Sequence, residues 1–247
     1  DGLGAADLSA LPLGYYAMSI EGVVGESPVA VGFPFGVVSA EAAMSEPANS
    51  RFGVHLHYGA GSERLSNGIE DMARLGIGHA RSDFTWWWGE RSPGEYYYEA
   101  DVREAMTKLA AEGMTALRLP VYSNPNYDGG RTPSSQAGLT AYANFAANAI
   151  AAFPGTGSDV EVYNEFEHRG FSECGTTPAC YLDMLKTTAA TVKASYPDAK
   201  IIGPGVAGMG VKFDWLEGFI AVGGLEYVDA VSLHPYVHPE APEVLVD

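Results

Sequence analysis

Hydrophobic residues along most of this chain alternate between short continuous runs and stretches with helical spacing. Six strands are predicted, some from apolar runs and some from apolar residues alternating with polar ones, at residues 52–57, 78–83, 114–121, 159–164, 200–203 and 228–233. Between them, apolar residues recur three and four positions apart over 101–112, 138–153 and 179–196, and more weakly over 66–75 and 213–221, which predicts helices. This alternation indicates a parallel sheet joined by right-handed crossovers.

The segment DVREAMTKLAAEG carries the clearest helix signals. Asp101 is expected to cap the helix, with Glu104 three residues later, and Gly113 is expected to end it. One face of the predicted helix is apolar and should pack on the sheet: Val102, Ala105, Met106, Leu109 and Ala110.

The first 45 residues follow a different pattern. LPLGYYAMSI, VVGESPVAVGF and FGVVSA are short strand-like runs broken by glycine and proline, with no helical stretch among them. We interpret residues 1–45 as the end of a β-sandwich accessory module with a structural role. SEPANS at 45–50 is expected to be a linker.

Six β-α repeats fit an open doubly wound sheet as well as an eight-stranded barrel. A barrel takes about 250 residues, whereas only residues 51–247 follow the predicted linker. If the fold is a barrel, residues 46–247 hold about six of its eight β-α units. A further segment or a partner chain would then complete it, because two sheet edges would otherwise be exposed.

The composition narrows the range of partners. Hydrophobic residues make up 47% of the 247 residues, which is enough for a sizeable core. The formal net charge of −17 argues against nucleic acid and anionic membranes, because both favour basic surfaces. A neutral or cationic substrate is compatible, although the acidity can also serve only to keep the protein soluble. No apolar run approaches the roughly 20 residues of a membrane span.

The two cysteines bear on the cellular compartment. Cys174 and Cys180 lie in the loop-like stretch SECGTTPAC. They can close a small disulfide loop, as in exported proteins, or remain two free thiols. The chain begins at Asp1 without a methionine, as a processed or trimmed chain does. We expect the disulfide, and a secreted, extracellular protein.

Polar residues gather where the predicted strands end, which is where a β/α barrel carries its active site. Strand five ends in GPG and offers nothing ionisable. The other strand ends supply imidazole, guanidinium, carboxylate, amide and phenol groups: His55, His57, Arg81, Asp83, Tyr122, Asn124, Asn126, Asn164, Glu165, His234 and Tyr236. Their convergence predicts a site on that rim.

The stretch VEVYNEFE contains the strongest candidate for acid catalysis. Alternation along a strand places Glu161, Tyr163 and Glu165 on one face. Glu165 is the last of the three and should stand at the rim, where a carboxyl can act as a general acid; a surface glutamate at a loop start is the plain alternative. Glu161 lies deeper and is expected to pair with a barrel arginine.

The run FTWWWGERSPGEYYY is dense in aromatic residues for a loop. Flat rings can stack on the apolar faces of sugars. At least two of these rings are expected instead to pack between helices and strands.

Several of these stretches together resemble clan A glycoside hydrolases, and most of all glycoside hydrolase family 39. RSDFTWWWGERSPGEYYY is similar to the strand-two region of that group, and PVYSNPNYDGG to its strand-three loop. VEVYNEFE resembles the Asn-Glu motif that ends strand four, and VSLHPY resembles strand six with its His-x-Tyr. The resemblance runs in unbroken order from about residue 52 to 236 and implies a (β/α)8 TIM barrel of the α/β class.

The resemblance implies roles for individual residues. Glu165 would be the acid/base of a retaining glycosidase, and Asn164 would bind the sugar hydroxyl next to the anomeric carbon. Arg81 would sit under the nucleophile and hold it ionised. His234 and Tyr236 would line the subsite of bond cleavage. Further sugar contacts are implied for His55, His57, Trp86 and Asn124. The substrate would be a poly- or oligosaccharide, and the chemistry requires no metal and no organic cofactor.

The chain departs from the family pattern in two places. Phe166 follows Asn-Glu where the family often has proline. The family's nucleophile is a glutamate at the end of strand seven, and the sequence stops at Asp247, soon after strand six. Glu240 and Glu243 fall in the proline-rich stretch HPEAPEV, so we assign neither as the nucleophile.

Three other interpretations follow from the residues. His55-x-His57 at a strand end also suits a metal-dependent amidohydrolase-type barrel, but strand five supplies no further histidine. GPGVAG at 203–208 matches a dinucleotide-binding pattern, yet no helix is predicted to open there, so we expect a loop. The aromatic cleft could also bind carbohydrate without cutting it.

Overall fold

The computed structural model describes residues 7–8, 10–25, 27–37, 51–57, 63–168, 174–207 and 213–235 of the 247-residue chain. Several sequence predictions lie outside these ranges. They are the linker at 45–50, the sugar contact Tyr236, and the acidic residues Glu240 and Glu243.

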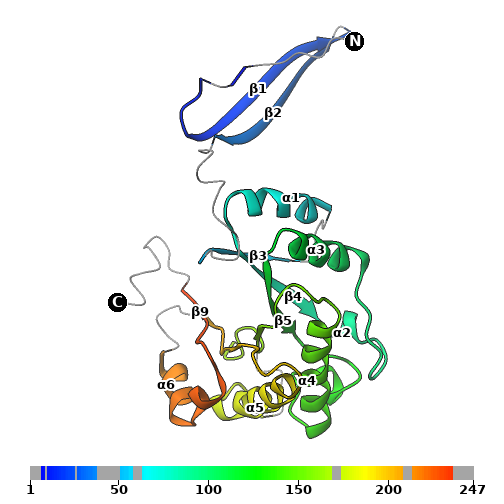
Figure 1. Ribbon diagram of the computed structural model, residues 1–247, viewed down its shortest axis with the longest axis vertical. Helices are drawn as coiled ribbons and strands as arrows, with labels where there is room; N and C mark the ends of the chain where they lie inside the picture. The colour runs from blue at the N-terminus through cyan, green and yellow to red at the C-terminus, as the bar shows by residue number, and fades with distance from the viewer. Residues whose placement is uncertain are drawn as a thin grey trace.

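The N-terminal segment is a long antiparallel hairpin. Strands β1 (Gly14–Val24) and β2 (Ser27–Val37) pair along their whole length, from Gly14↔Val37 to Val24↔Ser27. The sequence predicted shorter runs broken at proline and glycine. Both strands of a two-stranded sheet are edge strands, where Pro28 and Pro34 are tolerated, so these residues do not interrupt β2. The hairpin stands apart from the α/β body in Figure 1.

The body contains a five-stranded parallel sheet whose spatial order follows the chain order. Its strands are β3 (Gly53–Leu56), β4 (His79–Thr85), β5 (Thr115–Val121), β6 (Val160–Glu161) and β7 (Ile201–Ile202). Strands β8 (Val206–Ala207) and β9 (Leu233–His234) form a second parallel pair, and an Ile202↔Ala230 bridge joins β7 to the segment before β9. Consecutive parallel neighbours are the arrangement of a β/α barrel wall.

The predicted helices are all present, with small shifts at their ends. They are α1 (Glu63–Arg74), α3 (Ala100–Ala111), α4 (Gln136–Ala151), α5 (Pro178–Ser195) and α6 (Phe213–Ala221). The sequence did not predict the short helix α2 (Trp86–Gly89) or the 3₁₀ turns η3 (Asp128–Gly130) and η4 (Gly224–Tyr227). None of the described helices is both long and apolar enough to cross a membrane.

Two helices are capped by a serine and a threonine, whereas the aspartate predicted to cap α3 does not do so. The Ser135 side chain accepts a hydrogen bond from Gly138 N at the start of α4, and Thr177 caps α5 in the same way. The prediction for Asp101 was wrong. Helix α3 already begins at Ala100, so Asp101 lies in its first turn, where its carboxylate favours the helix dipole.

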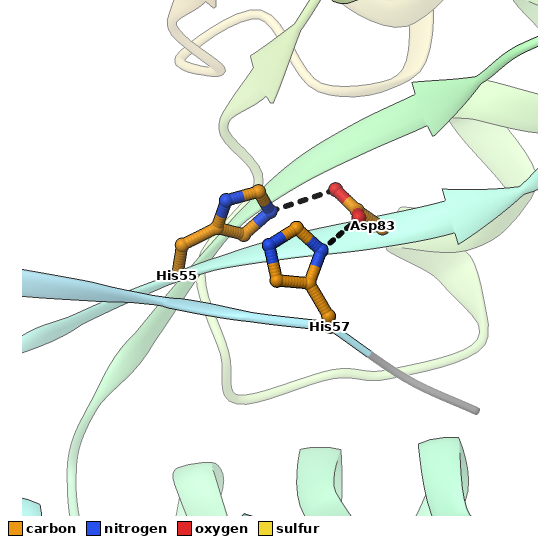
Figure 2. A group of neighbouring side chains, drawn as sticks. All are labelled: His55, His57 and Asp83. Carbon is orange, nitrogen blue, oxygen red and sulfur yellow. Dashed lines mark hydrogen bonds and ion pairs between the residues drawn. The ribbon is translucent and has the colours of Figure 1, made fainter. Parts of the chain in front are cut away.

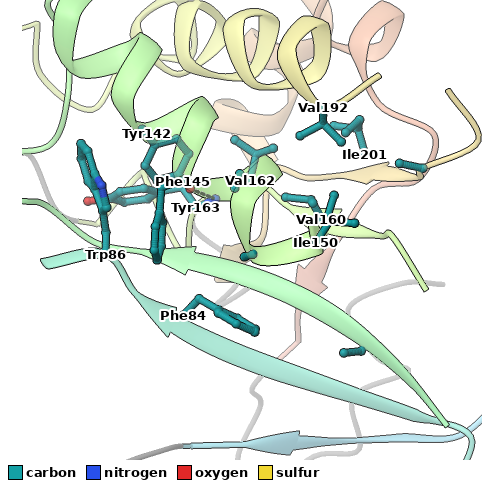
Figure 3. Packing of buried hydrophobic residues seen from close by; sticks show 14 of the residues in the cluster. Phe84, Trp86, Tyr142, Phe145, Ile150, Val160, Val162, Tyr163, Val192 and Ile201 are labelled. Carbon is teal, nitrogen blue, oxygen red and sulfur yellow. Dashed lines mark hydrogen bonds between the residues drawn. The ribbon is translucent and has the colours of Figure 1, made fainter. Parts of the chain in front are cut away.

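The core lies between the sheet and helices α4 and α5 (Figure 3). Ile150 of α4 lies beside Val160 of β6, Val192 of α5 lies beside Ile201 of β7, and Phe145 of α4 packs on the ring of Tyr98. The side chains named from these helices and strands are almost fully buried, as the helical and strand periodicities require.

One buried cation ties this core to the end of α4. Arg118 of β5 is fully buried and donates hydrogen bonds to the carbonyl oxygens of Ala149 and Phe153 and to Thr156 Oγ1. Carbonyl groups at a helix C-terminus lack helical partners, and a cation there also favours the helix dipole. Arg118 therefore anchors the last turn of α4 to the sheet.

The opposite, inner face of the sheet is open. A hollow of about 420 Å³ lies along it, bordered by side chains of β3, β4 and β5 that include His55, His79 and Arg81. In a closed barrel this space is filled by layers of side chains. His55 and Arg81 therefore face this hollow, on the side of the sheet away from helices α4 and α5.

A disulfide joins Cys174 to Cys180 at the start of α5, with the two Cα atoms 5.8 Å apart. This confirms the predicted pairing.

Candidate active site

Arg81 is the hub of the polar residues on the inner face. It points inward from β4 and donates from Nε to Glu161 Oε2 (2.5 Å) and from Nη2 to Asn164 Oδ1 (2.8 Å). Its Nη2 also lies 3.4 Å from His234 Nε2. One guanidinium thus connects strand β4 with the residues at the ends of β6 and β9, which is possible because its donors form a rigid fork.

Glu161 is the fully buried counter-ion of Arg81. Its other oxygen accepts a 2.7 Å hydrogen bond from Ser232 Oγ. Burial raises the pKa of this carboxyl, but the nearby His234 imidazole and the Arg81 guanidinium outweigh it and bring the pKa to about 2. The sequence predicted that Glu161 pairs with a barrel arginine, and the ion pair confirms this.

Glu165 reaches the same centre through an irregular backbone. Tyr163 and Glu165 both have positive φ angles, of 65° and 50°, which few residues other than glycine adopt. The predicted alternation therefore ends after β6. Tyr163 turns its ring into the core against Tyr142, and its hydroxyl is hydrogen-bonded to Thr132 Oγ1, whereas Glu165 stays on the inner face.

The Glu165 side chain is held by an imidazole. Its Oε1 lies 2.8 Å from His234 Nδ1, and 28% of the side chain is exposed. His234 Nε2 lies 3.7 Å from Glu161 Oε1 on the other side. Glu161 raises the pKa of His234, burial lowers it, and Glu165 raises it again, so that the balance favours the imidazolium.

A glycine permits this close arrangement. Gly205, in the GPG stretch after β7, has a φ of +63°, and its carbonyl oxygen accepts a hydrogen bond from Glu165 N (3.1 Å). A Cβ atom at this position would lie 2.9 Å from Glu161 Oε1. Strand five supplies no ionisable group, but its glycine lets the loop approach Glu161 and position the Glu165 backbone. GPGVAG was expected to be a loop; within its described part no helix begins, but Val206–Ala207 form strand β8.

Asn164 has a fixed orientation between two neighbours. Its oxygen accepts from Arg81 Nη2, and its Nδ2 donates to the hydroxyl of Tyr122 (3.2 Å). A carboxamide has two N–H donors, so one donor is left for a further partner.

His55 and His57 form a second polar group with Asp83 (Figure 2). His55 Nε2 lies 2.8 Å from one carboxylate oxygen, and His57 Nδ1 lies 2.7 Å from the other. Burial raises the pKa of Asp83, but the two imidazoles outweigh it and lower the pKa overall. Arg81 Nη1, 3.1 Å from His55 Nδ1, connects this group with the hub.

Two residues implied to contact sugar are instead part of the scaffold. Trp86 and Asn124 have no exposed surface. The Trp86 ring stacks on Tyr127, and its Nε1 donates to Glu90 Oε2 (2.5 Å). Asn124 Nδ2 donates to Glu90 O (2.7 Å). Neither side chain can reach a sugar, so these two assignments are corrected.

Other rings of the aromatic run are exposed to solvent, unlike that of Trp86. Trp87, Trp88 and Tyr97 expose 48%, 36% and 48% of their surface, and the two indoles meet edge to face. Phe84 is buried with Trp86, which confirms that at least two rings of this run pack internally.

Glu90 and Ser232 are hydrogen-bond partners that were not predicted from the sequence. Ser232 could have been found, because it lies two residues before His234 and therefore on the same face of an extended segment. Glu90 gave no such signal, because its role depends on the unpredicted helix α2. Phe166, which departs from the family's proline, is buried against the rings of Tyr163 and Tyr181.

No protein-family model and no curated protein matches the chain by sequence. Solved structures do match its fold. A family 39 glycoside hydrolase from the gut symbiont Bacteroides cellulosilyticus WH2 aligns with a TM-score of 0.73 and 24% identity, over 93% of this chain and 47% of that one. The family 39 enzyme from Xanthomonas axonopodis pv. citri aligns with a TM-score of 0.52 and 18% identity, over 79% of this chain and 43% of that one.

The catalytic domain of the family 30 xylanase C from Talaromyces cellulolyticus has a TM-score of 0.55 and 15% identity, over 74% of this chain and 52% of that one. This chain thus spans about half the length of the structures it matches. It has the fold of part of a (β/α)8 barrel of the kind seen in these glycoside hydrolases, which confirms the predicted fold class.

Proposed function

We propose that this chain carries the acid/base half of the active site of a retaining glycoside hydrolase similar to family 39. The observation that carries the proposal is the position of Glu165. It stands at the end of the fourth barrel strand, partly exposed, with one carboxyl oxygen 2.8 Å from His234 Nδ1. That contact orients the carboxyl and leaves its second oxygen for a leaving group.

The proposed reaction cleaves an O-glycosidic bond of a poly- or oligosaccharide with net retention. Glu165 donates its proton to the leaving oxygen as the bond from the anomeric carbon breaks through an oxocarbenium-like transition state. In the second step it removes a proton from the water that attacks the glycosyl-enzyme. The nucleophile must lie about 5–5.5 Å from Glu165, and we assign that role to no residue of this sequence.

The neighbouring residues have supporting roles. Asn164 is proposed to donate its remaining N–H to the hydroxyl beside the anomeric carbon, because Arg81 and Tyr122 fix its orientation. Arg81, which already pairs with Glu161, would also keep the nucleophile in its ionised form. His234 lines the subsite where the bond breaks, and Tyr236 is proposed to do the same. His55 and His57 border the inner face beside Arg81, which suits sugar contacts.

The protein is also proposed to be secreted and to act outside the cell in carbohydrate degradation. The Cys174–Cys180 disulfide supports this, because disulfides persist mainly in oxidising compartments.

Glu165→Gln in the full-length protein tests the assignment. Turnover of aryl glycosides with poor leaving groups should fall by about 100-fold or more, because glutamine cannot donate the proton. Substrates with good leaving groups should lose much less in the first step, because these need little protonation. The measurement is kcat/KM across a series of leaving groups.

Glu112→Gln is the matched control, since Glu112 is exposed at the end of α3. It should leave the whole series unchanged. Equal activity of Glu165→Gln and wild type on poor leaving groups would overturn the assignment. A wild-type protein that binds oligosaccharides saturably but hydrolyses none would instead show a carbohydrate-binding barrel.

A further inference from the structure

Three side chains at the ends of β3 and β4 aim their ligand atoms at one point. His55 and His57 alternate on one face of an extended strand, and the pairing of His55 with Arg81 places Asp83 beside His57. Figure 2 shows both imidazoles turned toward the Asp83 carboxylate. One ligand atom from each residue lies within 4.8 Å of the others.

We propose that His55, His57 and Asp83 bind one divalent transition-metal ion of the Zn²⁺ class. When the ion is bound it takes the place of the direct sugar contacts proposed for His55 and His57, and the chemistry proposed for Glu165 is unchanged. Two imidazole nitrogens and one carboxylate suit zinc and its neighbours. Mg²⁺ and Ca²⁺ prefer sites made of oxygen ligands alone. The choice of ion thus follows from the donor atoms.

The observed spacing is close to what such an ion needs. Zinc holds nitrogen and oxygen ligands at about 2.0–2.2 Å in a tetrahedron, so that neighbouring ligand atoms lie roughly 3.3 Å apart. Here His55 Nε2 and His57 Nδ1 lie 2.8 and 2.7 Å from different oxygens of the Asp83 carboxylate, so one oxygen would serve as the ligand and the imidazole beside the other would turn toward it. Small rotations of the side chains would open these distances, and the ion would replace the shared protons of two hydrogen bonds.

The neighbouring arginine does not block this arrangement. Arg81 Nη1 lies 3.1 Å from His55 Nδ1 and 3.2 Å from Nε2. An atom that close to both nitrogens would collide with the C–H between them if it lay in the ring plane, so it lies over the ring face. The ring can therefore keep its proton on Nδ1 and offer Nε2 to a metal. The charge of Arg81 is balanced by Glu161.

The site is reachable from solvent, and it would have a mechanical effect. The His57 side chain is 65% exposed, whereas those of His55 and Asp83 are 29% and 22% exposed. Three protein ligands leave the fourth position of a tetrahedral ion to water. Among the described strands, β3 has four residues and pairs with β4 alone. A bound ion would fasten the end of β3 to β4.

Calorimetric titration of the full-length, chelator-treated protein with ZnCl₂ tests the proposal. Wild type should bind one equivalent, and excess Mg²⁺ should not compete. His57→Gln and Asp83→Asn should each weaken binding by about tenfold or more, since even changes around the ligands of metal sites have effects of that size. Zinc should also raise the Tm of wild type and leave that of Asp83→Asn unchanged, because an ion that binds only the folded state stabilises it.

His168→Gln is the matched control, because His168 also lies beside a carboxylate, 3.6 Å from Glu167, but has no second imidazole there. It should bind zinc as wild type does. The proposal is overturned if wild type binds no stoichiometric zinc, if both site variants bind it unchanged, or if His168→Gln loses it. His57 is mostly exposed, so His57→Gln remains a folded probe even if Asp83→Asn is not.

The titration contains no sugar, so its outcome does not depend on the glycosidase proposal. Glu165→Gln should bind zinc like wild type even where it fails to hydrolyse a glycoside. Loss of zinc binding in His57→Gln, in turn, says nothing about proton donation by Glu165.

Discussion

Two polar networks lie near the C-terminal ends of the strands, and they differ in their access to solvent. Around Glu90, a buried carboxylate accepts hydrogen bonds from Trp86 Nε1, Gly94 N and the Tyr127 hydroxyl. Around Arg81, the guanidinium, His234 and Glu165 keep side-chain exposures of 19%, 12% and 28%. Both networks combine carboxylates with aromatic or cationic donors.

The difference shows how a scaffold and a site can be told apart. The Glu90 carboxylate is buried and both of its oxygens accept from neighbouring donors, so it offers no exposed acceptor to a ligand. In the Arg81 network, the only hydrogen-bond partner described for the Glu165 carboxyl is His234, on Oε1, and Asn164 keeps a spare donor. Polar residues at a strand end indicate a site only when part of their hydrogen-bonding capacity faces an open surface.

The largest expected effect compares two adjacent tryptophans. Trp86→Ala should lower the free energy of unfolding by about 4 kcal/mol, because it empties a buried site and leaves Glu90 without its indole donor. Trp87→Ala should lower it by less than about 1 kcal/mol, since half of that ring is already in water. Urea unfolding of both variants measures the contrast. Similar losses would mean that the Glu90 network is not the rigid scaffold described.

An intermediate effect concerns acid stability. The pKa of Glu161 is lowered to about 2 from 4.5, so its contribution is present above pH 4.5 and is lost as the pH falls toward 2. Between these values, wild type should lose roughly 3 kcal/mol more than Glu161→Gln. Unfolding free energies measured across this range give the difference. Parallel curves for the two proteins would contradict the pairing with Arg81, and Glu112→Gln should follow wild type.

The smallest effect concerns His234 near neutral pH. Its pKa is raised by Glu161 and Glu165 against burial and the charge of Arg81. The resulting stability is complete below about pH 6.5, the usual histidine value, and is lost as the pH rises through the raised pKa. It should amount to no more than about 1 kcal/mol, as for a partly solvated ion pair. The difference in unfolding free energy between wild type and His234→Gln should therefore narrow with rising pH. A difference that widens would mean that the pKa of His234 is lowered in the folded protein, contrary to this prediction.

The sequence predicted the sheet and helices well because their signal is periodic burial. The prediction of the last strand was less accurate. Residues 228–233 were predicted to form it, but strand β9 begins at Leu233. Residues before it contact β7 through the bridge from Ala230 to Ile202 and through two hydrogen bonds between Asp229 and Ile201. Short strands of two residues depend on neighbours far away in the chain, and their limits leave little trace in local spacing.

The positions of the site residues could be predicted where they follow the regular alternation of a strand. They could not be predicted where the backbone leaves that alternation. Arg81 and Glu161 follow strand alternation and meet as expected. Tyr163 breaks that alternation because the backbone has positive φ angles at Tyr163 and Glu165, and its ring lies against Tyr142 of α4. Trp86 and Asn124 were misplaced because helix α2 folds the aromatic run back onto Glu90, which a motif comparison does not reveal.

The bonds around Arg81 also determine how this region can fold. Its partners Glu161, Asn164 and His234 lie 80, 83 and 153 positions further along the chain. Closing such long loops is entropically unfavourable before the intervening helices have packed, and contacts of high sequence separation slow folding. The cluster cannot form from any local fragment of the body. The cluster should therefore form only when all the strands that it joins have folded. A signal from the environment of His234 would follow that last step.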